Sequence, residues 1–116
     1  SDLPIREELF KGDPARGRRS FGFDDSKPVL LVMGGSSGAQ AINRAVRGIL
    51  EDLTGSFQVL HICGHGNLYD IYERTPGYWQ TEYLHAELAD ALACADVVVS
   101  RAGSNSICEL LALSSV

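Results

Sequence analysis

The amino-acid sequence predicts an α/β fold with a Rossmann-like parallel sheet. Three observations support this prediction: apolar runs of strand length recur along the chain, amphipathic segments separate them, and glycine-rich turns follow two of them. Strands that alternate with helices are joined by right-handed crossovers, which make the strands parallel. We predict the doubly wound strand order 3-2-1-4.

The regular pattern begins at residue 29. Residues 29–33 form a continuous apolar run, which is typical of a strand buried on both faces. Further strands are predicted at residues 57–62, 79–84 and 96–100. Apolar residues at helical spacing predict helices over residues 41–53, 68–74 and 87–94, and a last helix that begins near Gly103.

The composition is that of one small globular domain. The chain has 116 residues, of which 45% are hydrophobic and 22% charged, enough to bury a modest core. The net charge of −5 argues against a nucleic-acid partner, which would need a basic surface. No apolar run approaches the roughly 20 residues of a membrane span, and no signal-peptide pattern is present. We expect a protein of the cytoplasm.

Three cysteines, Cys63, Cys94 and Cys108, lie far apart and lack the spacing of metal ligands. An odd number at such spacing predicts no disulfide framework and indicates a reducing compartment. We interpret all three as small buried hydrophobic residues and predict no metal site.

Residues 1–28 are rich in turn-forming residues. We interpret them as a linker and an irregular or helical lead-in to a domain at residues 29–116. Arg16, Arg18 and Arg19 form a basic cluster. We interpret it as part of a solvated loop rather than as a site that binds an anionic membrane surface. The last predicted helix stops where another strand should follow, so we expect the domain to be incomplete at its C-terminus. The fourth strand would then have a free apolar edge, which invites self-association.

Two glycine- and serine-rich loops, residues 34–39 and 101–106, follow the first and fourth predicted strands. In the order 3-2-1-4 these strands are neighbours, and a crevice opens at their carboxyl ends. Each loop leads into a helix N-terminus, where free N–H groups and the helix dipole attract anions. Either loop alone could be a tight turn with a helix cap, but two that converge predict a diphosphate site. Its loop glycines are Gly34, Gly35, Gly38 and Gly103.

The familiar diphosphate motifs are absent. A P-loop requires a lysine directly after its last glycine, and none follows Gly38. The dinucleotide fingerprint requires a different glycine spacing and an acid at the end of the second strand. Glu109 is placed either to accept hydrogen bonds from ribose hydroxyls or to close a capping box with Ser106. The residues alone leave these two roles evenly balanced.

Residues 34–39 and the long segment 95–106, with Glu109 beyond it, resemble the MurG family of glycosyltransferases. Residues 3–6 are similar to the segment by which the chain of that family enters its C-terminal domain. The resemblance implies a GT-B fold, in which this chain is the C-terminal, donor-binding domain. It implies transfer of N-acetylglucosamine from UDP-GlcNAc to a lipid-linked muramoyl-peptide (lipid I to lipid II) in peptidoglycan synthesis. The full-length enzyme would be peripheral on the cytoplasmic face of the plasma membrane.

The resemblance also implies roles for individual residues. Ser36 and the backbone of residues 104–108 would hold the diphosphate, Glu109 the ribose, and the Leu84 backbone the uracil, with Arg6 near the donor phosphates or sugar. The implied UDP-sugar-binding residues are Arg6, Ser36, Leu84, Ser104, Asn105, Ser106, Ile107, Cys108 and Glu109. The catalytic residues are unknown and are expected, like the lipid acceptor site, in an N-terminal domain. No cofactor is expected.

Two alternatives stay open on the sequence. One is a related GT-B enzyme that forms a glycolipid from a UDP-sugar, and the other is a non-catalytic nucleotide-binding module. His61, His65 and His85 belong to no motif that would make them catalytic bases, so we interpret each as a surface or packing residue.

Overall fold

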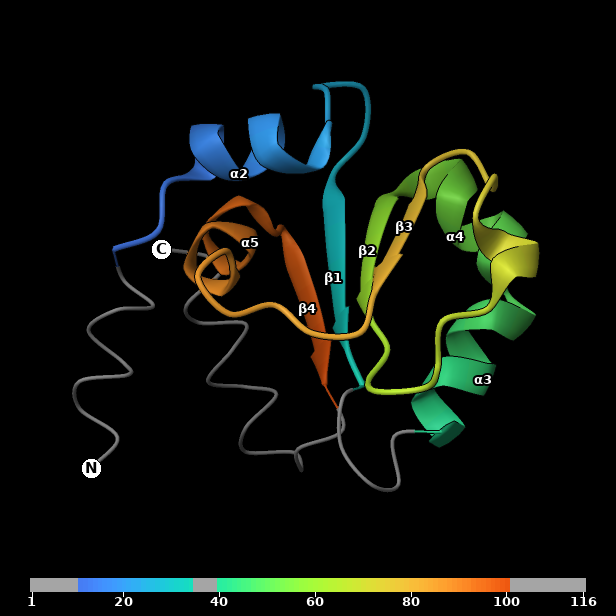
Figure 1. Ribbon diagram of the computed structural model, residues 1–116. Helices are drawn as coiled ribbons and strands as arrows, with labels where there is room; N and C mark the ends of the chain where they lie inside the picture. Colours follow the sequence, from blue (N-terminus) through green and yellow to red (C-terminus); the bar gives the residue numbers. More distant parts are fainter. Residues whose placement is uncertain (1–10, 35–39, 101–116) are drawn as a thin grey trace.

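The computed structural model describes residues 11–34 and 40–100. Over these residues it contains a parallel sheet of order β3-β2-β1-β4 (Figure 1). The strands are β1 (Val29–Met33), β2 (Gln58–Ile62), β3 (Tyr78–Thr81) and β4 (Val97–Ser100). The predicted Rossmann-like class and the strand order 3-2-1-4 are confirmed.

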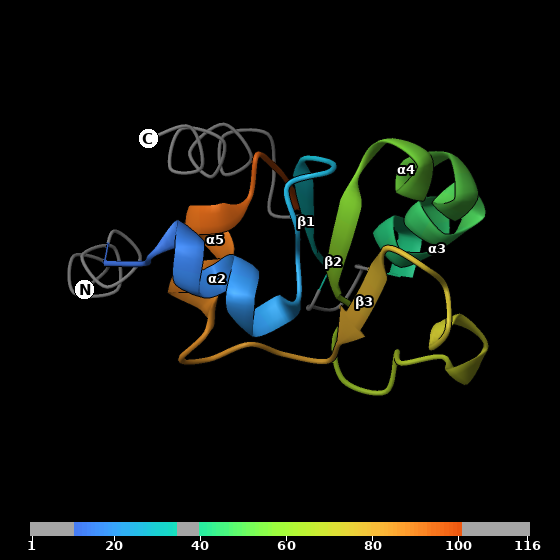
Figure 2. The same cartoon turned by 90° about the horizontal axis from the view of Figure 1, so that it is seen from above.

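Helices lie on both faces of the sheet. They are α2 (Pro14–Phe21), α3 (Gln40–Gly48), α4 (Leu50–Ser56) and α5 (Leu88–Cys94), with a 3-10 turn η1 (Asp70–Tyr72). Viewed from above, α2 and α5 cover one face and α3 and α4 the other, so the sheet is the middle of three layers (Figure 2). This arrangement is the one expected when a parallel sheet is buried on both sides.

Three predicted elements differ from the structure by more than one residue. The helix predicted over residues 41–53 is two helices, because Ile49 leaves the helical conformation with φ −121° and ψ 24°. The helix predicted over residues 68–74 is reduced to η1. The strand predicted to reach Leu84 ends at Thr81, opposite Ile62, the last residue of β2. The chain after β2 leaves the extended conformation at Gly64, whose φ is 87°, so the pairing ends after the Gly64 N–H donates to the Glu82 carbonyl at 3.0 Å.

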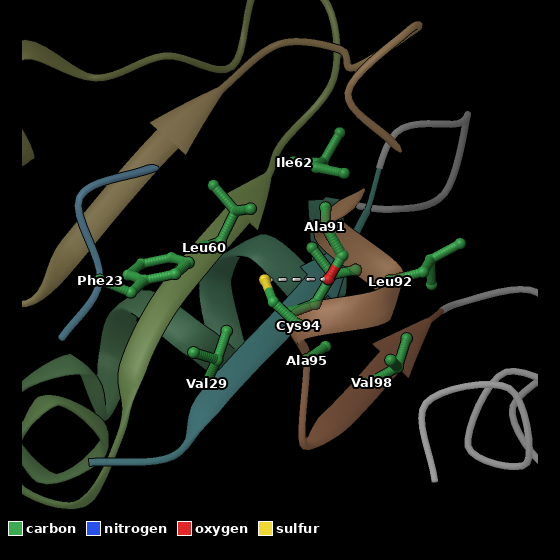
Figure 3. Close-up of a cluster of buried hydrophobic side chains, with 10 residues drawn as sticks. Phe23, Val29, Leu60, Ile62, Ala91, Leu92, Cys94, Ala95 and Val98 are labelled. Atoms are coloured by element: carbon green, nitrogen blue, oxygen red, sulfur yellow. Dashed lines mark hydrogen bonds between the residues drawn. The ribbon is translucent and has the colours of Figure 1, made fainter. Parts of the chain in front are cut away.

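A core of buried side chains fills the layer between the sheet and α2 and α5 (Figure 3). Its members are Phe23, Val29, Leu31, Leu60, Ile62, Ala91, Leu92, Cys94, Ala95 and Val98. The Cys94 thiol donates a hydrogen bond to the carbonyl of Ala91 at 3.4 Å, and burial raises its pKa to about 11. Cys63 is buried too, so the prediction for these two cysteines is confirmed, whereas Cys108 lies outside the described residues.

A second core lies on the opposite face of the sheet, under α3 and α4. It consists of Leu30, Val32, Val46, Leu50, Val59 and Tyr78. Successive side chains of a strand point to opposite faces, so β1 contributes Val29 and Leu31 to one core and Leu30 and Val32 to the other. This double burial explains why β1 is a continuous apolar run.

Helix α2 begins with a well-formed cap. The Asp13 side chain accepts hydrogen bonds from the N–H groups of Ala15 and Arg16, Pro14 is the first helical residue, and Gly22 ends the helix at φ 75°. The interpretation of the arginine cluster as a solvated loop was therefore wrong: all three arginines lie in or on α2. Arg16 pairs with Asp90 and Arg18 with Asp25.

Arg16 joins α2 to α5 through Asp90. Its Nε and Nη2 atoms donate to the two Asp90 carboxylate oxygens at 2.7 and 3.0 Å, and the Asp13 N–H donates to the same carboxylate at 2.9 Å. The Arg16 guanidinium, followed by the Asp13 N–H, holds the pKa of the Asp90 carboxyl below its usual range. The charged form of Asp90 therefore stabilises the packing of these helices.

This contact predicts a loss of stability in acid. Because the pKa of Asp90 is lowered by folding, its contribution is present above the unfolded value of about 3.9 and is lost as the pH falls through the folded value. We expect Asp90→Asn to lower the free energy of unfolding at pH 6 and to lower it much less at pH 3. Urea unfolding at the two pH values measures this. Asp25→Asn is the control, because that exposed carboxylate pairs with Arg18 at 3.3 Å; an equal pH dependence in both variants would contradict the role of Asp90.

Candidate functional site

The carboxyl ends of β1 and β4 lie side by side. The two strands are parallel, and their register pairs Leu30 with Val97 and, at the last position, Met33 with Ser100. Both arrow tips point to the same edge of the sheet (Figure 1). The segments that follow β1 and β4 therefore start from adjacent points, as the predicted strand order requires.

The structure describes two of the predicted site residues, Gly34 and Leu84. Gly34 is buried at the end of β1, and its N–H donates to the carbonyl of Ile62 at 2.8 Å. The other predicted site residues lie outside the described residues and stay predictions: Arg6, Gly35, Ser36, Gly38, Gly103, Ser104, Asn105, Ser106, Ile107, Cys108 and Glu109.

Leu84 lies in the connection between β3 and α5, just past the carboxyl end of the sheet. Its side chain is half-buried and packs against the core under α5. Within residues 11–34 and 40–100, neither its N–H nor its C=O has a hydrogen-bond partner. These backbone groups can therefore bind a ligand at that edge, which is the role the resemblance implies.

A tight loop, residues 63–67, follows β2 at the same edge. Gly64 and Gly66 have φ values of 87° and 76°, which side chains rarely allow. The loop is fixed to the end of β3, because the N–H of Gly66 donates to a Glu82 carboxylate oxygen at 2.6 Å. His65 is exposed, with its Nδ1 3.8 Å from that carboxylate, as predicted for a surface residue.

A buried chain of polar side chains, missed by the sequence analysis, lies beneath this loop. His61 of β2 is fully buried, with Nε2 2.7 Å from Asn43 Oδ1 and Nδ1 2.7 Å from the Tyr78 hydroxyl. Asn43 Nδ2 donates to the Cys63 carbonyl at 2.9 Å. The prediction that His61 is a packing residue is confirmed, but its polar partners on α3 and β3 were not foreseen.

Arg47 of α3 completes this buried polar chain. Its Nε donates to the Tyr78 hydroxyl at 3.3 Å, and its Nη2 donates to the Asn67 carbonyl at 2.6 Å and to Gln80 Oε1 at 2.8 Å. Its guanidinium lies 4.4 Å from the centre of the Tyr69 ring, a cation–π distance. One side chain thus connects α3, the loop at residues 63–67 and β3.

The charge state of His61 follows from this environment. Burial, and then the nearby Arg47 guanidinium, lower its pKa to about 4. His61 is therefore neutral at physiological pH, and its ring offers one donor and one acceptor. A neutral, fully hydrogen-bonded imidazole in the core is suited to structure rather than to proton transfer with a substrate.

The open groove of the described structure lies elsewhere. A groove of about 800 Å³ runs along the amino ends of β2 and β3, between Asp24, Glu51 and Pro76, at the edge opposite the predicted site. A smaller hollow of about 230 Å³ lies over α3, between Arg44, Arg47 and Tyr69. Neither of the two is lined by a residue of β1 or β4.

Neither a membrane-spanning helix nor a metal-binding cluster occurs among the described residues. Over residues 11–34 and 40–100, no helix has the length and apolar character needed to cross a bilayer. In those same ranges, His, Cys, Asp and Glu side chains form no group of three or more placed to hold a metal ion.

Known proteins with similar sequences are named as one kind of transferase. A Clostridium perfringens protein named "UDP-N-acetylglucosamine--N-acetylmuramyl-(pentapeptide) pyrophosphoryl-undecaprenol N-acetylglucosamine transferase" is 50% identical over 110 residues, or 95% of this chain. A Lachnoclostridium phytofermentans protein of the same name is 51% identical, and a Bacillus anthracis protein with the name ending in "2" is 50% identical, each over 95% of this chain. The chain spans 31% of the length of each relative.

No solved structure matches the chain. One family model covers the sheet together with both predicted loops. The model of the glycosyltransferase family 28 C-terminal domain matches residues 29–115. The chain therefore belongs to the family defined by the glycosyltransferase family 28 C-terminal domain.

Proposed function

We propose that this chain is the donor-binding part of a glycosyltransferase. The enzyme would move N-acetylglucosamine from UDP-GlcNAc to a lipid-linked muramoyl-peptide, the step from lipid I to lipid II in peptidoglycan synthesis. The observation that carries the proposal is the pairing of Met33 with Ser100 at the carboxyl edge. It makes the two glycine- and serine-rich loops start side by side, and the names of the relatives indicate the sugar nucleotide.

The chemistry of a diphosphate fits this edge of the sheet. Helix α3 begins at Gln40, directly after the first loop, and helix N-termini attract anions through their N–H groups and positive dipole. In the proposed site Ser36 and the backbone of residues 104–108 hold the two phosphates, and Leu84 binds uracil through its backbone. During transfer the same donors stabilise the negative charge that develops on the departing UDP.

The rest of the proposed reaction requires groups from outside this chain. An acceptor oxygen must be aligned with the anomeric carbon of the donor sugar, and we assign acceptor binding and the catalytic residues to an N-terminal domain. The chain spans 31% of its relatives, so the whole enzyme is the unit of activity. We place that enzyme on the cytoplasmic face of the plasma membrane, as a peripheral protein.

Self-association through β4 is part of the same proposal. Among the described residues β4 pairs with β1 alone, and Val99 on β4 is 36% exposed. A strand at the edge of a sheet can pair with a second copy, and we propose this contact for β4. Sedimentation equilibrium at several protein concentrations tests this, and a monomer throughout would exclude it.

Titration with UDP tests donor binding directly. We expect UDP to shift the backbone amide signals of both loops, residues 34–39 and 101–109, and of Leu84, in ¹H–¹⁵N spectra of the labelled chain. The shifts should be saturable and should be larger for UDP than for ADP or NAD at equal concentration. Shifts confined to one loop, or an equal response to NAD, would contradict the site.

A further inference from the structure

We propose that Asn43, His61 and Tyr78 are positioning residues for the donor site. They form one hydrogen-bond chain of fixed direction, which fastens the first turn of α3 to the carboxyl end of β2. This inference rests on the proposed function, because the site they position is the proposed diphosphate site. It adds three buried side chains that the predicted site did not include.

The groups at the two ends of the hydrogen-bond chain, Arg47 and the Cys63 carbonyl, fix the direction of its hydrogen bonds. A guanidinium is only a donor and a backbone carbonyl is only an acceptor. Arg47 Nε donates to the Tyr78 oxygen at one end, and Asn43 Nδ2 donates to the Cys63 oxygen at the other. Rotating the Asn43 amide by half a turn would set its oxygen against the Cys63 oxygen, so the amide has one favourable orientation.

The middle of the chain follows from these ends. With Asn43 Nδ2 directed at Cys63, its Oδ1 must accept from His61 Nε2 at 2.7 Å. A neutral imidazole then has its acceptor at Nδ1, so the Tyr78 hydroxyl, 2.7 Å away, donates to it. Every donor in the chain from Arg47 to Cys63 meets an acceptor. A satisfied buried network of this kind is rigid, whereas a partly satisfied one is costly.

Helix α3 is fastened to this end of the sheet along one face. Gln40, Asn43 and Arg47 are separated by three and four residues, so they lie on the same side of the helix. Gln40 Nε2 donates to Asn67 Oδ1 at 3.0 Å, and Arg47 Nη2 to the Asn67 carbonyl at 2.6 Å. Asn67 Nδ2 in turn donates to the Cys63 carbonyl at 2.9 Å, the same oxygen that Asn43 binds.

These contacts fix both flanks of the first predicted phosphate loop. On the strand side, the Gly34 N–H donates to the Ile62 carbonyl at 2.8 Å. On the helix side, Asn43 in the first turn of α3 binds the carbonyl of Cys63, the next residue. The consecutive carbonyls of Ile62 and Cys63 thus fix the distance between the end of β1 and the start of α3. A shift of the helix N-terminus by even 1 Å would misplace donors that must meet a phosphate.

Tyr78→Phe tests this role with the smallest change. It keeps the ring in the core but removes the hydroxyl that Arg47 donates to and that donates to His61, so Arg47 Nε and His61 Nδ1 each lose a hydrogen-bond partner. We expect the Kd for UDP, measured per folded molecule by amide titration, to rise about threefold to tenfold. Asn43→Asp, which keeps the oxygen facing His61 and loses the donor to Cys63, should have a similar effect. Tyr69→Phe is the matched control, because Tyr69 is an exposed residue and its hydroxyl is not part of the hydrogen-bond chain. The Kd of this variant for UDP should not change.

A second readout needs no ligand. In the ¹H–¹⁵N spectrum of the His61 ring we expect a proton on Nε2 and none on Nδ1, and Tyr78→Phe should shift the Gly34 and Gln40 amides. An unchanged Kd in both folded variants overturns the inference, as does a ring proton on Nδ1. If the wild type binds no UDP, the proposed function fails, and the positioning role is then decided by the ring proton and by the Gly34 and Gln40 shifts. If Tyr78→Phe does not fold, Asn43→Asp carries the comparison.

Discussion

Replacing Gly17 by alanine is expected to destabilise the domain by about 3 kcal/mol, in the range of overpacked cores. Gly17 is buried in α2, against α5. A Cβ at this position would overlap the carbonyl oxygen of Asp90 and lie 3.0 Å from Cys94 Sγ. The obstructing atoms include helix backbone, which cannot rotate away, so the two helices must separate. Urea unfolding, followed by the fluorescence of Trp79, the one tryptophan in the chain, measures the loss.

Helix propensity alone predicts the opposite sign. Alanine is better than glycine inside a helix by about 1 kcal/mol, so Gly17→Ala should stabilise the domain if α2 were only a solvated lead-in. Gly55→Ala in α4 is the matched control, because a Cβ there meets nothing within 4 Å. We expect that variant to be neutral or up to about 1 kcal/mol more stable. Equal effects of the two substitutions would show that α2 does not pack closely on α5.

The sheet could be predicted from the sequence because each strand carries its own signal. β1 begins and ends where its apolar run does, since both of its faces are buried. The helix break at Ile49 could not be found this way. Val46 and Leu50 on either side of it are both buried, so the apolar spacing continues through the break without a visible change. The backbone turns while the buried face stays in place.

The sequence could predict only those parts of the site that follow from the strand order. Neighbouring β1 and β4 follow from the doubly wound order, whereas the buried polar chain depends on three elements that meet in space. A signal was present, however: His61 interrupts an otherwise apolar strand, and Asn43 falls on the apolar stripe of its helix. Buried polar residues of this kind need partners, and the sequence does not say which residues provide them.

The Gly17 contact shows the same limit. The sequence predicts turn-forming residues over residues 1–28, and Gly22 at φ 75° is one. Gly12 and Gly17 instead leave room for the backbone of α5, close to Ala89 and Asp90. A glycine that forms a turn and a glycine that makes room for a neighbouring helix look the same in the sequence, and only the structure distinguishes them.

Glu109→Gln is expected to have the largest effect on donor binding. The substitution keeps the size of the side chain and removes the charge that we propose binds the ribose hydroxyls. Charge-assisted hydrogen bonds contribute roughly 1.5–3 kcal/mol, so the affinity for UDP should fall about tenfold to a hundredfold. Titration by isothermal calorimetry, on this chain or on the whole enzyme, measures the change. Glu51→Gln controls for the altered net charge, because Glu51 is an exposed residue of α4, away from the carboxyl edge.

The same variant separates the two roles that the sequence leaves open for Glu109. In the ribose role, the free energy of unfolding should change by no more than about 1 kcal/mol, the cost of a weakened helix cap, while UDP affinity falls. In the capping-box role with Ser106, glutamine can replace glutamate, so Glu109→Gln should leave the affinity per folded molecule unchanged and change the free energy of unfolding by no more than about 1 kcal/mol. The UDP titration therefore assigns the residue, and unfolding in urea shows that the variant is folded. A folded variant that binds UDP as tightly as the wild type would make Glu109 a structural residue and leave the ribose without its proposed partner.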